Sequence, residues 1–169
     1  MGAYRLAEIA VELIQSHIQG NIASALASVR TERNDPIVTT EPPKEYFIYE
    51  EAHVYRPPAI FTIIQAQDIR NEKMGANHIN AADTIYVAAV VEDRVARLVT
   101  IKAWRYQAAL MEILHQVSLT SSDNAVRLFS RVQNCEFSGL INIKKSDSET
   151  VFRKEMSLKL MVEHIENLE

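Results

Sequence analysis

The sequence predicts a single α+β domain in which a mostly antiparallel β-sheet packs against two main helices, with long loops or an extended arm. Three observations lead to this fold class: two segments with apolar residues at helical spacing, a closing segment that alternates apolar and polar residues, and no linker-like composition between them. The 169 residues are 47% apolar and carry a net charge of -4. Such a composition is ordinary for one domain with its own core, so residues 1–169 are expected to form one unit.

An amphipathic helix is predicted over residues 4–29, because apolar side chains recur every three or four positions between Leu6 and Val29. Gly20 interrupts this pattern. An interior glycine costs about 1 kcal/mol relative to alanine, and we therefore expect a kink or a break there. Pro36 ends the helical region, since the residue before a proline is disfavoured in helical geometry.

The next region, residues 36–58, is rich in proline and holds two short extended runs, 37–39 and 46–50. Proline lacks a backbone donor, so these runs belong at a sheet edge or in an extended arm. Residues 59–65 are rich in β-branched and aromatic side chains and predict a well-covered strand, the start of a sheet-and-helix core over 59–165.

A long polar loop is predicted over residues 68–83, where no periodicity is evident, and a further strand over 84–91. Loops of this length in a domain are usually functional or disordered. His78, Asn80 and Asp83 share this loop, and catalytic groups often sit on loops held by a rigid scaffold, so an enzyme site around His78 and Asp83 is one hypothesis.

A second helix is predicted from Arg94 to about Gln116, with Asp93 as its N-cap. Its outer face carries apolar residues among charged ones, which is typical of a surface covered by another subunit. The subunit-interface candidates on this helix are Leu98, Ile101, Trp104 and Met111.

Two long strands close the chain, over residues 125–137 and 150–165, joined by a polar connection around 142–149. The last strand shows the clearest alternation in the sequence, which predicts one face toward a core and the other toward water or a polar partner. Its even positions hold Phe152, Met156, Leu158, Leu160 and Val162, and its polar odd positions are Arg153, Glu155, Ser157, Lys159 and Glu163.

Little in the chain predicts catalytic, cofactor or metal chemistry. One cysteine, Cys135, excludes an intrachain disulfide, and no HExxH motif or pair of histidines at ligand spacing occurs. Only four glycines are present, so a glycine-rich phosphate loop is absent. No apolar run reaches the ~20 residues of a membrane span, and the first residues lack a signal-peptide layout. We expect no catalytic, cofactor-binding or metal site and no membrane partner.

The order of elements resembles that of tail-terminator and head-to-tail joining (neck) proteins of tailed bacteriophages. The resemblance rests on the leading helix, the proline-broken region, the long loop, the helix carrying WRYQAALMEIL, and the closing segment 151–163. It implies a non-enzymatic virion protein that forms a ring, commonly a hexameric one, in the tail or neck. The implied partners are the tail tube protein, connector or adaptor proteins and, in a contractile tail, the sheath.

The resemblance also implies assembly in the host cytoplasm and a lumen through which DNA passes without specific binding. We expect the polar odd positions of the last strand to line that lumen, unless this face packs against the chain's own helices. Two other interpretations remain open. One is a small enzyme with its site in the 68–83 loop, and the other is an adaptor that binds a protein partner without forming a ring.

Overall fold

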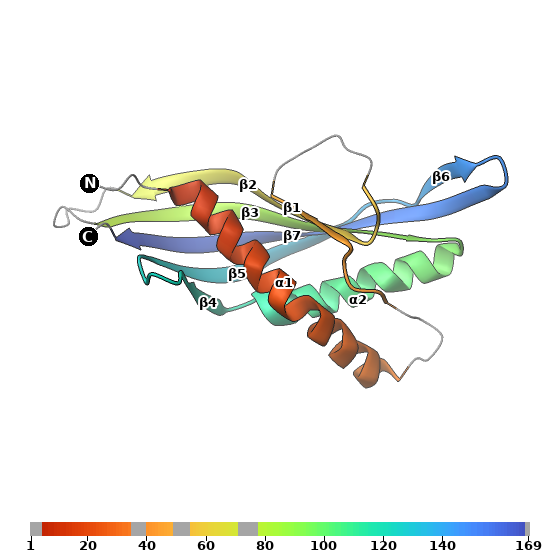
Figure 1. The fold of residues 1–169 in the computed structure, drawn as a ribbon, viewed down its shortest axis with the longest axis horizontal. Helices are drawn as coiled ribbons and strands as arrows, with labels where there is room; N and C mark the ends of the chain where they lie inside the picture. Colours follow the sequence, from red (N-terminus) through yellow and green to blue (C-terminus); the bar gives the residue numbers. More distant parts are fainter. Residues whose placement is uncertain (1–4, 35–39, 49–54, 71–77, 168–169) are drawn as a thin grey trace.

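The computed structural model describes residues 5–34, 40–48, 55–70 and 78–167, and within them two helices lie on one face of a seven-stranded sheet (Figure 1). This arrangement confirms the predicted α+β class. The helices are α1 (Leu6–Arg33) and α2 (Ala96–Leu114). The strands are β1 (Glu45–Phe47), β2 (Ala59–Arg70), β3 (His78–Asp93), β4 (Val117–Thr120), β5 (Val126–Phe137), β6 (Ile141–Ser146) and β7 (Glu149–Asn167).

The long strand β7 organises the sheet, whose order is β1-β2-β3-β7-β5-β4. Along one side β7 pairs with β3 from Phe152 to Asn167, and along the other it pairs first with β6 and then with β5. Every pairing is antiparallel except that of β1 with β2, as the mostly antiparallel prediction requires. The β6–β7 hairpin projects from one end of the molecule (Figure 1).

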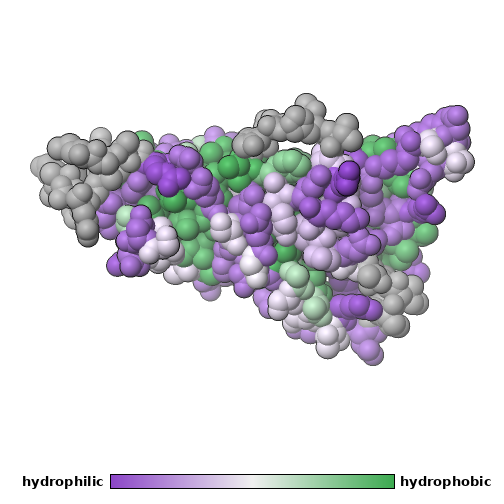
Figure 2. Space-filling view, viewed as in Figure 1, coloured by the Kyte–Doolittle hydropathy of each residue, from purple (hydrophilic) through white to green (hydrophobic). Residues whose placement is uncertain are grey.

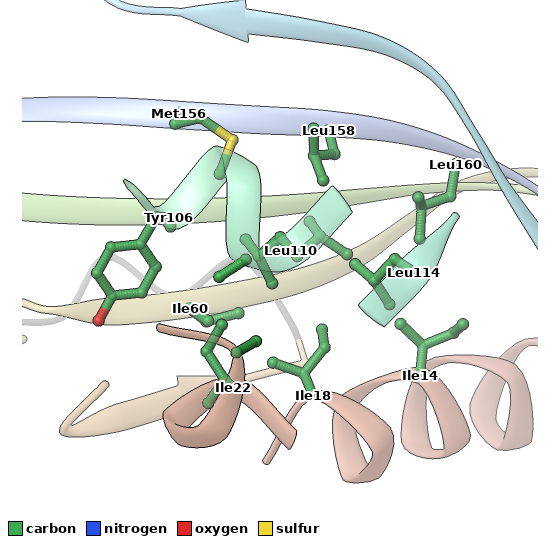
Figure 3. Close-up of a cluster of buried hydrophobic side chains, with 14 of the residues drawn as sticks. Ile14, Ile18, Ile22, Ile60, Tyr106, Leu110, Leu114, Met156, Leu158 and Leu160 are labelled. Carbon is green, nitrogen blue, oxygen red and sulfur yellow. The ribbon is translucent and has the colours of Figure 1, made fainter. Parts of the chain in front are cut away.

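The core lies between the sheet and the two helices (Figure 3). The predicted alternation of β7 is confirmed, because Met156, Leu158, Leu160 and Val162 are fully buried there. Burying one such side chain contributes roughly 1.5–3 kcal/mol. The helices meet them with Ile14, Ile18 and Ile22 of α1 and Tyr106, Leu110 and Leu114 of α2.

Helix α1 runs through Gly20 as one continuous helix, so the break expected there does not occur. Buried Ile18 and Ile22 flank the glycine, and their packing against the core offsets its cost of about 1 kcal/mol. The helix ends at Arg33, four residues later than predicted. Asn34 then adopts the left-handed conformation at φ 46°, and its N–H donates to Arg30 and Thr31 carbonyls.

The prediction of a loop over residues 68–83 is also wrong at both ends of that range. Strand β2 continues to Arg70 and β3 begins at His78, with Asp68 opposite Ala82 and Arg70 opposite Asn80. Polar residues are tolerated here because one side of the sheet is not covered by the helices. The remainder of this loop and the predicted run 37–39 lie outside the described residues.

Two short strands fall where the sequence predicted only loop. Strand β4 occupies Val117–Thr120 beside β5, and β6 occupies Ile141–Ser146 within the predicted polar connection. Both are short and partly polar, and each exists because a longer neighbouring strand supplies its hydrogen-bonding partner. Strand β1 lies at the sheet edge, as the prolines around it predicted.

The start of α2 differs from the prediction as well. Asp93 is the last residue of β3, and Val95 rather than Asp93 is the N-cap. The Asp93 carboxylate instead accepts a hydrogen bond from the Val95 N–H at 2.9 Å. Strand pairing with β7 extends to Asp93 and therefore moves the helix start two residues along the chain.

Candidate assembly surfaces

The sheet face opposite the helices, here called the open face, carries the five residues predicted to line a lumen. Because β7 alternates, burial of its even positions against the helices turns its odd positions outward. Glu155 and Glu163 are exposed, and Arg153, Ser157 and Lys159 are half-buried. The open face is thus not packed against the chain's own helices, and a lumenal role for these residues stays a prediction.

Strand pairing adds residues to the open face that the sequence pattern did not single out. Glu163 lies between Ala82 of β3 and Phe129 of β5, and Met161 lies beside Arg131. Phe129 remains 37% exposed. The face therefore mixes both signs of charge with apolar side chains, and only the strand register could bring these residues together.

Arg153 differs from the other four candidates because its guanidinium is bound within the chain. Its Nε donates to Glu92 at 2.7 Å, and the guanidinium lies over the Tyr55 ring at 4.9 Å from the centroid. Tyr55 and Phe47 both pack against Phe61, at 5.2 and 4.9 Å between ring centroids. Arg153 is thus a packing residue at this end of the open face.

The four interface candidates of α2 differ in their exposure. Trp104 is 55% exposed, whereas Met111 packs against the core and Leu98 is half-buried. Trp104 and Ile101 line a groove of about 480 Å³ between α2 and the end of α1, which we call the Trp104 groove. Its other lining residues are Val29, Arg33, Arg105, Gln107 and Ala108. The α1 contribution could not be foreseen, since it depends on how the helices cross.

The residue that anchored the enzyme alternative, Asp83, lies inside the molecule. Its carboxylate is fully buried, accepts a hydrogen bond from Gln67 Nε2 at 2.7 Å, and lies 3.1 Å from Nδ1 of His164. His164 is itself 1% exposed, and its Nε2 lies 3.8 Å from Glu166. A substrate cannot reach groups this deeply buried, and the side chain of His78 lies outside the described residues.

Glu166 gives this buried polar cluster a structural role. Its two carboxylate oxygens accept hydrogen bonds from the backbone N–H groups of Arg5 and Leu6, each at 3.0 Å. These are orphan donors of the α1 N-terminus, and no side chain within the helix caps them. Strand β7 thereby caps α1 across 160 residues of sequence.

Outside this cluster, the surroundings of Cys135 and Tyr106 shift the pKa values of their side chains. Burial raises the pKa of the Cys135 thiol, and Glu136 adds to the rise while a hydrogen bond with Gln107 opposes it. The thiol is therefore a weak nucleophile near neutral pH.

Burial, with Tyr46 and Glu41 nearby, also raises the pKa of Tyr106. The Tyr106 hydroxyl donates to the Glu41 carbonyl at 2.6 Å and fastens the proline-rich region to α2.

Across the described part of the chain, no group of three or more potential metal ligands is placed to hold an ion. None of the described helices is both long and apolar enough to cross a membrane.

Viewed from the helix side, the surface is mainly hydrophilic, with separate hydrophobic areas between the polar ones (Figure 2).

Comparisons with known proteins find similarity among solved structures. No protein-family model matches the chain, and no curated protein matches it. Among solved structures, the chain is similar to one from the "Virion of native gene transfer agent (GTA) particle", with 13% sequence identity and a TM-score of 0.35. The match covers 86% of this chain and 97% of that one. A TM-score this low establishes neither a shared fold nor a shared function.

Proposed function

We propose that this chain is a non-enzymatic structural subunit of a phage-like virion, a ring-forming tail terminator or neck subunit that caps the tail tube and joins the tail to the head. The observation that carries the proposal is its one-sided architecture. Both helices cover one sheet face, while the open face and the outer side of α2 present apolar and charged side chains together. The resemblance in element order supports the same assignment.

The Trp104 groove supports a subunit contact. A tryptophan that is 55% exposed beside a groove holds much unburied apolar surface, and each 100 Å² removed from water contributes about 2.5 kcal/mol. Tryptophan and arginine are also the residues most often responsible for binding energy at interfaces. A ring requires such a patch to meet a different patch on the next copy.

The open face suits a surface along which DNA moves. Exposed Glu155 and Glu163 repel phosphates, and the basic residues Arg131 and Lys159 are interspersed with them rather than gathered into one patch. A mixed face of this kind lacks the many phosphate contacts that hold a protein on DNA. We keep the tail tube, connector and, in a contractile tail, sheath proteins as the expected partners.

The test is the mass of the assembled chain, measured by light scattering and native mass spectrometry, with electron microscopy of the product. We expect wild-type protein to form a closed ring and Trp104→Ala to remain monomeric. The matched control is Ile69→Ala, another apolar residue that is 46% exposed but lies on β2. Both substitutions should change the free energy of unfolding by less than about 0.5 kcal/mol, since both sites are surface positions.

The alternatives give different results in the same experiment. A wild-type chain that stays monomeric at every concentration, and is absent from the tail ends of particles, would contradict the ring. A stable one-to-one complex with a different protein would favour the adaptor. No described feature favours the enzyme, because the carboxylate of Asp83, on which that interpretation depended, is fully buried.

A further inference from the structure

We propose that successive copies dock head to tail, with the corner between β5 and β6 of one copy seated in the Trp104 groove of the next. The β5–β6 corner comprises residues 136–141 together with Glu155. The inference rests on the proposed ring and names the two surfaces that would close it. Its partner is a second copy of this chain.

The corner lies on an open edge of the sheet. Strand β4 covers β5 only from Arg127 to Ser130, and β6 pairs with β7 alone within the described residues. Where β5 gives way to β6, three apolar side chains face solvent: Phe137 at 38%, Leu140 at 47% and Ile141 at 54% exposed. Unpaired edges beside exposed apolar residues are normally covered in native proteins.

Hydrogen bonds of Ser138 hold the corner in one conformation. The Ser138 N–H donates to the Glu155 carbonyl at 2.9 Å, and the Ser138 hydroxyl accepts from the Glu155 N–H at the same distance. Lys154 Nζ also donates to the Ser138 carbonyl at 2.6 Å. A projection held in place before binding loses little conformational freedom when it docks.

Charge complementarity identifies a second copy as the occupant. The groove is apolar at Val29, Ile101 and Trp104 and carries Arg33 and Arg105. The corner exposes Phe137, Leu140 and Ile141 and also carries exposed Glu136 and Glu155. Both halves of a matched pair thus occur on one chain, and opposite charges at a rim select the partner and its orientation.

The two surfaces share no residue. A contact between two different patches is heterologous, and its repetition gives a closed ring or an open filament rather than a two-fold dimer. In this docking, Glu155 lies at the boundary between copies instead of lining the lumen. The other exposed acidic residue of β7, Glu163, is not part of the corner and remains on the open face.

The experiment reverses the charge on each surface separately. Arg33→Glu with Arg105→Glu makes the groove acidic, and Glu136→Lys with Glu155→Lys makes the corner basic. Each double variant alone then sets like charges against each other. We expect the subunit concentration at half-assembly to rise about tenfold or more for each variant alone.

Mixing the two double variants in equal amounts should restore assembly, because every groove then meets a corner of opposite charge. The product should contain both variants in alternation, as native mass spectrometry would show. The variant with all four substitutions should assemble by itself, which also shows that each substitution is compatible with folding. Asp147→Lys with Glu163→Lys is the control, since it changes the charge equally at exposed sites outside both surfaces.

Each contrary result has a distinct meaning. If wild-type protein forms rings and both double variants form them equally well, the docking is wrong while the proposed function stands. A mixture that stays monomeric overturns the docking as well, and one that stops at dimers shows a two-fold contact instead. If wild-type protein never assembles, the ring and the docking both fail.

Discussion

At the residue scale, Asp93 shows how one carboxylate joins two elements. Oδ1 accepts from the Val95 N–H at 2.9 Å and Oδ2 lies 2.7 Å from Nζ of Lys102, with side chains only 16% and 19% exposed. Burial by itself would raise the pKa of Asp93, but the Lys102 ammonium and the Val95 amide outweigh it and lower the pKa. The sequence predicted Asp93 as the N-cap of α2, which is wrong, because Val95 is the N-cap and Asp93 accepts a hydrogen bond from its N–H instead.

Replacing Asp93 by asparagine should lower the free energy of unfolding by about 1 kcal/mol at pH 7, because the ion pair with Lys102 is lost. The pKa of Asp93 is lower in the folded chain than the unfolded value of about 3.9, so its contribution is present above that pH. It disappears as the pH falls through the folded pKa. Urea unfolding at a series of pH values measures the difference.

The control for this prediction is Asp147→Asn, which alters an ion pair with Lys144 at a fully exposed carboxylate. That substitution should change stability by less than about 0.5 kcal/mol at any pH. A constant difference between wild-type and Asp93→Asn protein from pH 7 to pH 2 would show that the carboxylate's charge does not stabilise the fold.

At the element scale, α1 depends on a residue at the other end of the chain. Its amphipathic spacing explains why residues 6–33 are helical and which side packs inward, but its own N-cap, Arg5, provides no side-chain cap. Glu166 accepts the hydrogen bonds of the first N–H groups, and a negative charge is favourable at a helix N-terminus. Nothing in the local sequence around residue 5 indicates this partner.

Glu166→Ala should lower the free energy of unfolding by about 1–2 kcal/mol, since it removes a cap and leaves two backbone donors unpartnered. Amide hydrogen exchange in the first turns of α1 should accelerate more than in α2. Glu163→Ala, on the exposed side of the same strand, is the matched control and should have little effect on either measurement. Equal exchange rates in the two variants would contradict a capping role.

At the scale of the whole molecule, the sheet is covered on one face and open on the other, and the only tryptophan of the chain, Trp104, lies at the groove between the helices. With 55% of its surface exposed, its indole is in contact with water in the isolated subunit. The indole therefore reports directly on whether this groove becomes covered, without any added label.

We expect the tryptophan emission maximum to move to shorter wavelength as protein concentration rises and the groove is covered by the next copy. The Arg33→Glu, Arg105→Glu variant should keep the long-wavelength emission over the same range. Light scattering on the same samples gives the mass. An increase in mass without a wavelength shift would place Trp104 outside the subunit contact.

The fold class and the facing of the long elements follow from the sequence alone. The alternation from Met156 to Val162 and the apolar spacing from Ile14 to Ile22 arise between residues a few positions apart. Such periodicities select helix or strand and the buried side regardless of what packs against them. The ends of elements were less predictable, because β2 and β3 extend through a polar segment only by pairing with each other.

The candidate sites show the same distinction between what the sequence predicts and what the tertiary structure decides. The sequence by itself marked Trp104 and Ile101 as apolar residues on an outer face and marked the polar side of β7. Only the tertiary structure joined Trp104 to Val29 and Arg33, buried Asp83 against His164, and placed exposed Ile141 on an open edge. These results depend on strand register and helix crossing between residues up to 81 positions apart, for which neighbouring residues carry no periodic signal.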